Sequence, residues 1–510
     1  MCPTPAPAVP GGAASDRFAM HQSSILSSVA RGAAVNLVGL VLKAVETPLL
    51  YIVLTRLYGK APVGLFFIAY GIIEILGGLT ISGFIDGVVL YASRYIHKEE
   101  DRETLIHTLR AVLFFSVLLG VGIVLVLMLG APWFVSWYYP DHPALGPILQ
   151  ILALTLPFEA VSRILVNVSK AKMVMFHDVL LMGVMSPLFT IALAFLFHYL
   201  DIGSIGISLS FAMTYVLTLG GAVYLLSTLM DVRPIFQGMA INLRPPKMAS
   251  YIFAQNLNIA VVKFNYSLDV LMLAGFGVQP GKIAFYSLGS QVIRNIRQIR
   301  QVFSGSFSPV IARFHHEKRV DELDGALGRV SAWTTALALP VIFVMCYFRR
   351  DLMQVFDSTF TEDPTFMLVL AINPFLSCTI GLFGNVITMT GHSTINIING
   401  IGAFSINALV NWLLVPHLGL LGAAIASVTA GTAISVAQVF EARVLVGVHF
   451  PIRALLPPLF AGMALFLWPF FLLVPAVWLK IALSALLLGG YSAFIYYWSR
   501  LQKTKITGNA

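Results

Sequence analysis

The stretch from Arg31 to Gly59 constrains this chain most, because it is long and apolar enough to cross a membrane and yet carries charge. A helix needs about 20 apolar residues to cross a hydrocarbon core of about 30 Å. Lys43 and Glu46 fall near the middle of the stretch. Charge at that depth is costly and usually functional. We therefore predict a membrane helix with one face on a polar interior.

The polar residues of this stretch share one helical face at about 100° per residue. They are Arg31, Asn36, Lys43, Glu46 and Arg56, and the other face is Leu, Val and Ile. Because Lys43 and Glu46 are three residues apart, a local ion pair is the alternative to a role in a cavity.

Parts of this region return later in the chain. NLVGLVLK at 36–43 returns as NLNIAVVK at 256–263, which pairs Asn36 with Asn256 and Lys43 with Lys263. Three further pairs follow in the same order at offsets of 216 to 218: YGKAPVGLFFIAYG from Tyr58 with FGVQPGKIAFYSLG from Phe276, Pro157 with Pro374, and the segments ending at Ser210 and Ser427. The repetition predicts two homologous halves.

Composition and charge set the class of protein. The chain is 58% hydrophobic and 11% charged, with a mean hydropathy of +0.85, which is typical of a polytopic membrane protein. Its three cysteines form no spaced cluster, so we expect neither a disulfide framework nor a metal site. The net charge of +9 lies in short connections between spans, so we expect no nucleic-acid partner.

Apolar periods predict an all-α fold of fourteen transmembrane helices: two pseudo-symmetric six-helix lobes related as parallel repeats, plus two extra C-terminal helices. The predicted spans are 31–56, 62–91, 108–130, 146–168, 179–199 and 205–230, then 248–275, 281–312, 330–348, 365–390, 394–415 and 419–442, then 456–475 and 478–498.

The predicted organisation is a disordered tail at 1–25, an N-lobe at 26–232, a linker at 233–247, a C-lobe at 248–443, the two extra spans within 444–500, and a tail at 501–510. Alternate connections and the termini hold about 19 Lys and Arg, against about 6 on the opposite side. This bias predicts that both termini and the linker are cytoplasmic. Trp133 and Trp137 then lie at the outer interface.

The eighth span carries a cationic stripe. Gln291, Arg294, Arg297 and Gln298 fall close to one helical face. Arg294 lies roughly 20 Å from the outer end at 1.5 Å per residue, near the middle of the bilayer. We predict a cavity role for it, whereas Arg300 and Arg313 are expected to reach the cytoplasmic interface.

Acidic residues in the spans have two candidate roles, binding of a coupling cation or proton and neutralisation of the basic residues. They are Glu46, Glu74, Asp86 and Asp269. Glu159 and Arg163 are four apart and are expected to pair within their helix. No nucleophile and base set, metal-ligand spacing or phosphate loop occurs in the sequence. We expect no catalytic residue, no metal and no cofactor, and hence not an enzyme.

Three segments carry a family likeness: LTRLYGKAPVGLFFIAYG in spans one and two, FSGSFSPVIARF in span eight and LGLLGAAIAS in span twelve. From about 30 to 450 the chain resembles the oligosaccharide flippases and polysaccharide exporters of the multidrug/oligosaccharidyl-lipid/polysaccharide (MOP) superfamily. Its fourteen spans also resemble the lipid II flippase branch, whose two extra spans form a lipid groove.

The resemblance implies two lobes in a V, alternating access, and a cationic cavity for a lipid diphosphate that carries sugars. By analogy, the cavity cations are Arg31, Lys43, Arg56, Lys263 and Arg294. We expect Asn36, Asn256, Gln291 and Gln298 to meet sugar hydroxyls, with Arg297 on the same stripe.

The expected substrate is an oligosaccharide or polysaccharide precursor on an undecaprenyl-diphosphate type lipid. The expected location is the cytoplasmic (inner) membrane, and the expected state is a monomer among membrane lipids. Polysaccharide polymerases and glycosyltransferases are candidate partners. The alternatives are a multidrug cation antiporter of the same superfamily, which would favour net acidic lobes, and a membrane-embedded polysaccharide polymerase or ligase, which would favour a long outer loop.

Overall fold

The fold is entirely helical in the part of the chain that the structure describes. This computed structural model describes residues 45–95, 102–172, 174–237, 247–471 and 477–507. No strand occurs in these ranges. A helix satisfies its backbone hydrogen bonds within one segment, which the hydrocarbon interior of a membrane requires. The structure thus confirms the predicted all-α class.

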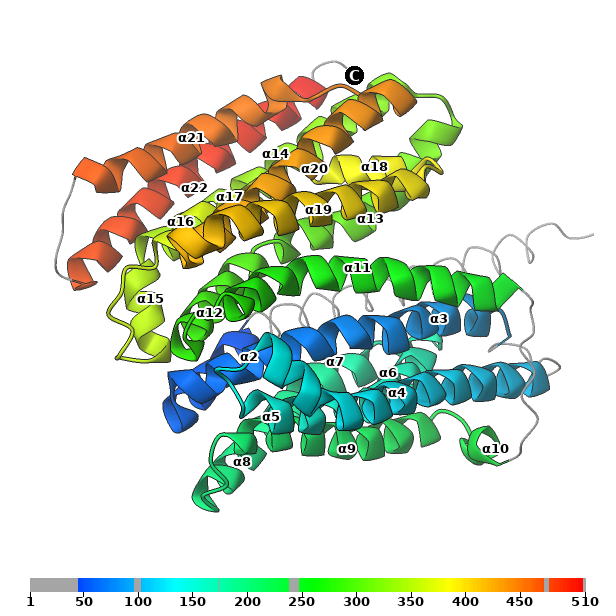
Figure 1. The fold of residues 1–510 in the computed structure, drawn as a ribbon. Helices are drawn as coiled ribbons and strands as arrows, with labels where there is room; N and C mark the ends of the chain where they lie inside the picture. The colour runs from blue at the N-terminus through cyan, green and yellow to red at the C-terminus, as the bar shows by residue number, and fades with distance from the viewer. Residues whose placement is uncertain (1–44, 96–101, 173, 238–246, 472–476, 508–510) are drawn as a thin grey trace, which may run out of the picture.

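The first bundle forms the lower half of Figure 1, coloured blue to teal. It begins with helical residues 45–58. Its further elements are α2 (Lys60–Gly77), the π-helix η1 (Gly78–Ser82), α3 (Gly83–Tyr95), α4 (Arg102–Tyr138), α5 (Leu145–Ala153), α6 (Thr155–Ala171), α7 (Phe176–Leu180), the π-helix η3 (Leu181–Met185), α8 (Ser186–Tyr199), α9 (Ile205–Ser227) and α10 (Arg233–Phe236).

The second bundle lies above it in Figure 1, with α11 (Lys247–Gly275) and α12 (Pro280–Asn295) next to the first bundle. Its other helices are α13 (Gln298–His316), α14 (Val320–Tyr347), α15 (Arg349–Phe356), α16 (Thr365–Leu370), α17 (Ile372–Ile380), α18 (Leu382–Met389), α19 (Ser393–Leu418) and α20 (Leu420–Val446). The last two, α21 (Ile452–Phe471) and α22 (Val477–Thr507), pack on α14.

Many of these helices can cross a membrane. In the described ranges ten helices are long and apolar enough, and the bent pair Thr365–Ile380 and Leu382–Met389 makes eleven if it is one span. The predicted span at 281–312 corresponds to α12 and α13, whose arginines and other polar residues make it less apolar than a typical span. Most of the predicted span at 31–56 lies outside the described residues.

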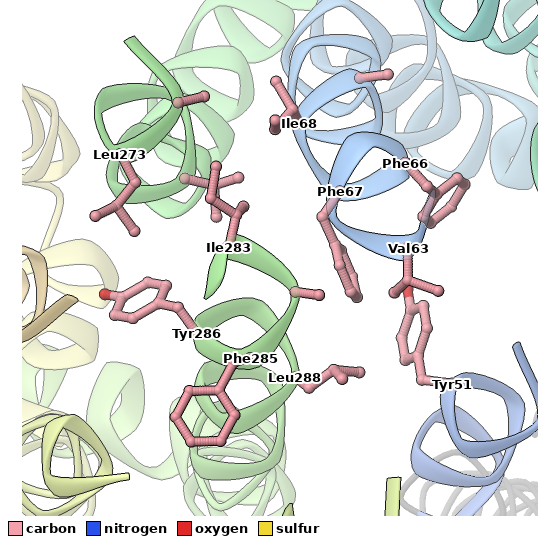
Figure 2. Close-up of a cluster of buried hydrophobic side chains, with 14 of the residues drawn as sticks. Tyr51, Val63, Phe66, Phe67, Ile68, Leu273, Ile283, Phe285, Tyr286 and Leu288 are labelled. Carbon is pink, nitrogen blue, oxygen red and sulfur yellow. The ribbon is translucent and has the colours of Figure 1, made fainter. Parts of the chain in front are cut away.

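The buried apolar side chains of the described residues form one large shared core and three smaller ones, the smallest of which joins α14 to α21 and α22. The shared core joins the bundles and includes Leu54 and Phe67 from the first and Ile283 and Phe366 from the second. Figure 2 shows part of it, with Phe67 and Ile68 of α2 facing Ile283 and Leu288 of α12. Further along the helices one core lies in the first bundle together with Met248 and Ile252 of α11, and another lies in the second bundle. Beyond the shared core, α11 therefore stays against the first bundle, whereas the other helices of the second bundle have a core of their own.

Glycines on α2 and η1 let the bundles approach closely. A Cβ atom on Gly64 would lie 1.8 Å from the carbonyl oxygen of Pro280, and one on Gly78 would lie 2.8 Å from Cα of Ala260. Small residues at helix interfaces allow such backbone packing in membranes. These contacts place α11 and α12 directly against α2.

Candidate functional site

The break between α12 and α13 brings a row of arginines to the region where the shared core ends. Arg294 lies in the last turn of α12, and its Nη1 donates to the carbonyl oxygen of Tyr266 (3.1 Å). Its Nη2 lies 3.4 Å from Oγ of Ser290. Both partners are neutral, so Arg294 forms no ion pair with either of them.

The next two arginines are held in the same way. The guanidinium of Arg297 lies 5.5 Å from the ring centroid of Tyr266, and its buried Nε has no hydrogen-bond partner. Nε of Arg300 donates to Oγ of Ser377 (3.0 Å). Among the described residues no carboxylate forms an ion pair with Arg294, Arg297 or Arg300. The row is therefore a concentrated positive site.

A small cavity adjoins this row, and we call it the second-bundle pocket. Its lining comes from α11, α12, α16, α17 and α20 and includes Arg294, Arg297, Tyr266, Asp269 and Ser427. Its volume is about 30 Å³, enough for one or two waters. In this conformation the arginines flank a nearly filled space.

Asp269 is the buried carboxylate of this pocket. Its Oδ2 accepts a hydrogen bond from the hydroxyl of Tyr286 (2.8 Å), and its Oδ1 accepts one from Nδ2 of Asn411 (3.1 Å). Asn411 also donates to Oδ1 of Asn407 (2.9 Å), and its own Oδ1 has no donor. Buried carboxylates need such donors. Because Oδ1 of Asn411 has no donor, it can join the Asp269 carboxylate in binding a proton or a cation.

A separate cavity, the first-bundle pocket, lies among α2, α5, α6 and α9. It is about 70 Å³ in volume. Its polar lining includes Tyr70, Glu74, Glu159, Arg163, Tyr215 and, from α11, Lys263. Nε of Arg163 lies 2.7 Å from Oε1 of Glu159, which confirms the intrahelical pair predicted from their spacing. Lys263 and Arg294 therefore face different cavities rather than one.

Tyr51 lies near a lining residue of each cavity. Its buried ring lies in helix 45–58, and its hydroxyl is 3.5 Å from Nε2 of Gln291 on α12. Both Glu74 and Arg294 are close enough to act on it electrostatically. Tyr51 therefore lies within electrostatic range of one lining residue of each pocket.

Two predicted site residues support the packing of α11 on α3. Oδ1 of Asn256 accepts a hydrogen bond from the backbone N–H of Gly83 (2.6 Å), directly after the π-helix. Asp86 accepts one from Nε2 of Gln255 (2.7 Å). Asn256 is buried and lines neither pocket. The structure therefore places it outside both pockets, and the role predicted for it at sugar hydroxyls has no support from its position.

The other predicted residues are scattered. Arg56 reaches the carbonyl oxygen of Val355 at the joined end of the bundles, far from the arginine row. Nε2 of Gln298 donates to Oδ1 of Asn295 (3.2 Å). Glu46 is half-buried. Arg31, Asn36 and Lys43 lie outside the described residues.

Sequence reasoning missed Tyr51, Tyr266 and Asn411. Each belongs to a residue type that is common in such a chain, and none follows from a repeat or from an isolated charge. The one available signal was the spacing of Asn407 and Asn411, four residues apart on α19, which places both amides on one helical face.

Comparison with solved structures finds the same fold in transporters. The lipid II flippase MurJ in its inward closed conformation matches with a TM-score of 0.69 at 14% identity, over 91% of this chain and 98% of that one. An inward-facing multidrug resistance MATE family transporter of the MOP superfamily matches at 0.65 and 16% identity, over 81% and 98%. A MOP superfamily transporter from Pyrococcus furiosus matches at 0.58 and 16% identity, over 82% and 95%.

At these low identities the structural similarity establishes the fold alone, which is that of these multi-pass membrane proteins. No protein of curated function matches the sequence. A family profile described as polysaccharide biosynthesis protein matches residues 41–359, which is more than half of the chain and contains helix 45–58, the first bundle and the arginine row. The chain therefore belongs to the polysaccharide biosynthesis protein family and has the MOP superfamily fold.

Proposed function

We propose that the protein is a flippase that moves a lipid-linked oligosaccharide or polysaccharide precursor, of the undecaprenyl-diphosphate type, across the cytoplasmic membrane. The observation that carries this proposal is the row Arg294, Arg297 and Arg300, which has no carboxylate partner among the described residues. Guanidinium groups match the paired oxygens of a phosphate. A diphosphate would supply the missing counter-charge.

Alternating access between the bundles would carry the headgroup. The shared core and two of the smaller cores support a V whose arms meet at one end. The loop-charge bias predicts that the joined end faces outward, so the arms part toward the cytoplasm. The lipid tail would remain in the bilayer while the bundles rock about the site.

Matching irregularities support two duplicated halves within fourteen spans. Leu154 separates α5 from α6, and Ala371 separates α16 from α17, 217 positions later. The two residues have nearly the same backbone angles, φ −60° and ψ −20° against φ −62° and ψ −19°. The π-helix that starts at Gly78 and the break at Ile296 are 218 positions apart.

Left-handed glycines recur at the same places. Gly59 (φ 81°) precedes α2, and Gly277 (φ 73°) precedes α12. Gly203 (φ 72°) precedes α9, and Gly419 (φ 54°) precedes α20. Only glycine adopts these angles readily. The offsets of 218 and 216 agree with those in the sequence repeat.

The source of energy is proposed to act through Asp269. Its carboxylate is buried beside the arginine row and is held by neutral donors, Tyr286 and Asn411. Binding of a proton or a cation there would change the local charge next to Arg294. Of the predicted coupling residues, Asp86 is already bonded to Gln255.

Complementation tests the proposal. In a strain that lacks its own exporter, Arg294→Ala and Arg297→Ala should abolish glycan export at unchanged protein level, because the diphosphate loses its counter-charge. The matched control is Arg313→Ala, since Arg313 is exposed on α13 and already paired with Glu317 (2.8 Å). Normal export by both first variants would refute the proposal.

The alternatives make different predictions in the same strain. A multidrug antiporter would lower the accumulation of a cationic dye and would tolerate the loss of arginines. A polymerase or ligase would change the length or attachment of the glycan while the lipid-linked unit still crossed the membrane. Polysaccharide polymerases and glycosyltransferases remain the proposed partners of a monomeric flippase.

A further inference from the structure

The first-bundle pocket holds two charged side chains that lack a counterpart. Glu74 of α2 and Lys263 of α11 line it, and neither forms a hydrogen bond or an ion pair with another described residue. The other two charges, Glu159 and Arg163, pair with each other at 2.7 Å. Among the described residues the charges that line the pocket therefore balance, and a carboxylate and an ammonium without described partners face the same space.

We propose that this pocket binds one uncharged sugar residue of the lipid-linked substrate, next to the diphosphate on the arginine row. This inference rests on the proposed flippase function. It assigns the sugar of the flippase substrate to the first-bundle pocket and the diphosphate to the arginine row. Sugar hydroxyls both donate and accept hydrogen bonds, so one ring can donate to Glu74 and accept from Lys263. A diphosphate would meet two carboxylates there, and a cation would meet Lys263.

The walls of the pocket suit a sugar ring. Tyr70 and Phe211 line it with ring centroids 6.0 Å apart, and Phe66 packs behind them at 5.4 Å and 4.7 Å. Apolar walls with a few well-placed polar groups are typical of small-molecule sites. The hydroxyl of Tyr215 lies within hydrogen-bonding reach of the Glu159 and Arg163 pair, so that pair also holds the wall in place.

The size of the pocket limits the ligand. A volume of about 70 Å³ accommodates roughly five waters, and one pyranose ring with its hydroxyls replaces a comparable set. A second sugar residue exceeds this space. The proposed site therefore selects one residue of the glycan and leaves the rest outside the pocket.

Tyr51 lies near both binding regions. It touches Gln291 of α12 and lies within electrostatic range of both Glu74 and Arg294. A sugar bonded to Glu74 and Lys263 is thus the one attached next to the diphosphate. Lys263 comes from α11, which packs on both bundles, so sugar binding would also bridge them.

Binding by the purified full chain in lipid nanodiscs tests this division. The probes are free glucose, free N-acetylglucosamine and inorganic pyrophosphate. Their binding is measured by ligand-observed NMR and by the thermal shift of the protein. Glu74→Gln and Lys263→Gln should weaken sugar binding about tenfold or more, because each removes a hydrogen bond to a charged group. Both variants should leave pyrophosphate binding intact. Arg294→Gln should weaken pyrophosphate binding and leave sugar binding intact.

The outcomes separate this inference from the flippase proposal. If sugar binding is absent in the wild type, or survives both Glu74→Gln and Lys263→Gln, the inference fails even when pyrophosphate still depends on Arg294. If Lys263→Gln removes pyrophosphate binding instead, Lys263 belongs to the diphosphate site and the inference also fails. Pyrophosphate binding that ignores Arg294 counts against the flippase proposal. Should Glu74→Gln not fold, Tyr70→Leu probes the same pocket.

Discussion

Arg56 joins two helices that are 299 positions apart in the sequence. Its Nε and Nη2 donate to the carbonyl oxygen of Val355 at 3.2 Å and 2.8 Å. Val355 lies in the last turn of α15, where carbonyls lack helical partners and favour a cation. The helix that carries Arg56 is fixed to the first bundle, since Tyr58 donates to the carbonyl oxygen of Ala194. Arg56 is thus a latch between the bundles rather than a residue of either pocket.

Removal of this latch should loosen the joined end. Arg56→Ala loses hydrogen bonds worth about 0.5–1.5 kcal/mol, so opening there should become a few-fold more frequent. The measurement is labelling of Val63→Cys by a membrane-impermeant maleimide, in a background where Cys2, Cys346 and Cys378 are serine. Arg313→Ala is the control. Equal labelling with and without Arg56 would show that the latch has no effect.

The close approach of α2 to α12 should not tolerate a side chain. Gly64→Ala places a methyl group against the carbonyl of Pro280, and overpacking of this kind costs about 1–3 kcal/mol. We expect a lower Tm and reduced export. Gly122→Ala is the matched control, because nothing lies within 4 Å of a Cβ atom at that helix position. Equal Tm values for the two variants would contradict the predicted clash.

Asp363 should give the loop after α15 a stability that depends on pH. Partial burial alone raises the pKa of Asp363, but hydrogen bonds from Arg350 and Arg349 outweigh it and lower the pKa below its ordinary value of 3.8. The ion pairs therefore stabilise the fold above pH 3.8, and this contribution is lost as the pH falls through the lowered pKa. The Tm of Asp363→Asn should lie below that of the wild type at neutral pH and converge with it in strong acid. A difference in Tm between the two proteins that stays the same at every pH would contradict the predicted role of the Asp363 ion pairs.

Asp269 should couple export to an ion gradient. Asp269→Asn keeps the size of the side chain but removes the charge that faces Tyr286 and Asn411. We expect export to fall at least tenfold, and the remainder to become insensitive to proton and sodium gradients imposed on membrane vesicles. Asp86→Asn is the comparison, because Asp86 is already bonded to Gln255. Gradient-dependent export by Asp269→Asn would exclude Asp269 as the coupling group.

Reporter fusions test the fourteen spans and the cytoplasmic termini. A reporter fused after Ser499 should be active in the cytoplasm, and one fused at Tyr139, after α4, should be active outside, because the basic connections alternate with the others. The opposite result at either position changes the number of spans.

The sequence by itself determined the features that depend on neighbours along one helix. Length and apolar composition indicated an all-α membrane protein, because only a helix of this length spans the bilayer without open backbone groups. The Glu159 and Arg163 pair followed from a spacing of four. Helical spacing predicted the arginines at 294 and 297 on one face, whereas the structure breaks the helix between them, with α12 ending at Asn295 and α13 beginning at Gln298. The resemblance in spans one, two, eight and twelve pointed to the family.

The tertiary structure decided where each helix face points. Lys263 and Arg294 were expected in one cavity, but the rotation of α11 directs Lys263 into the first bundle, where Glu74 lies. Asn256 bonds to Gly83 because the π-helix exposes that N–H beside α11. Arg56 finds its partner in α15. Such contacts depend on how tightly glycines such as Gly64 and Gly78 let helices approach, and the pattern of a single helix contains no information on that distance.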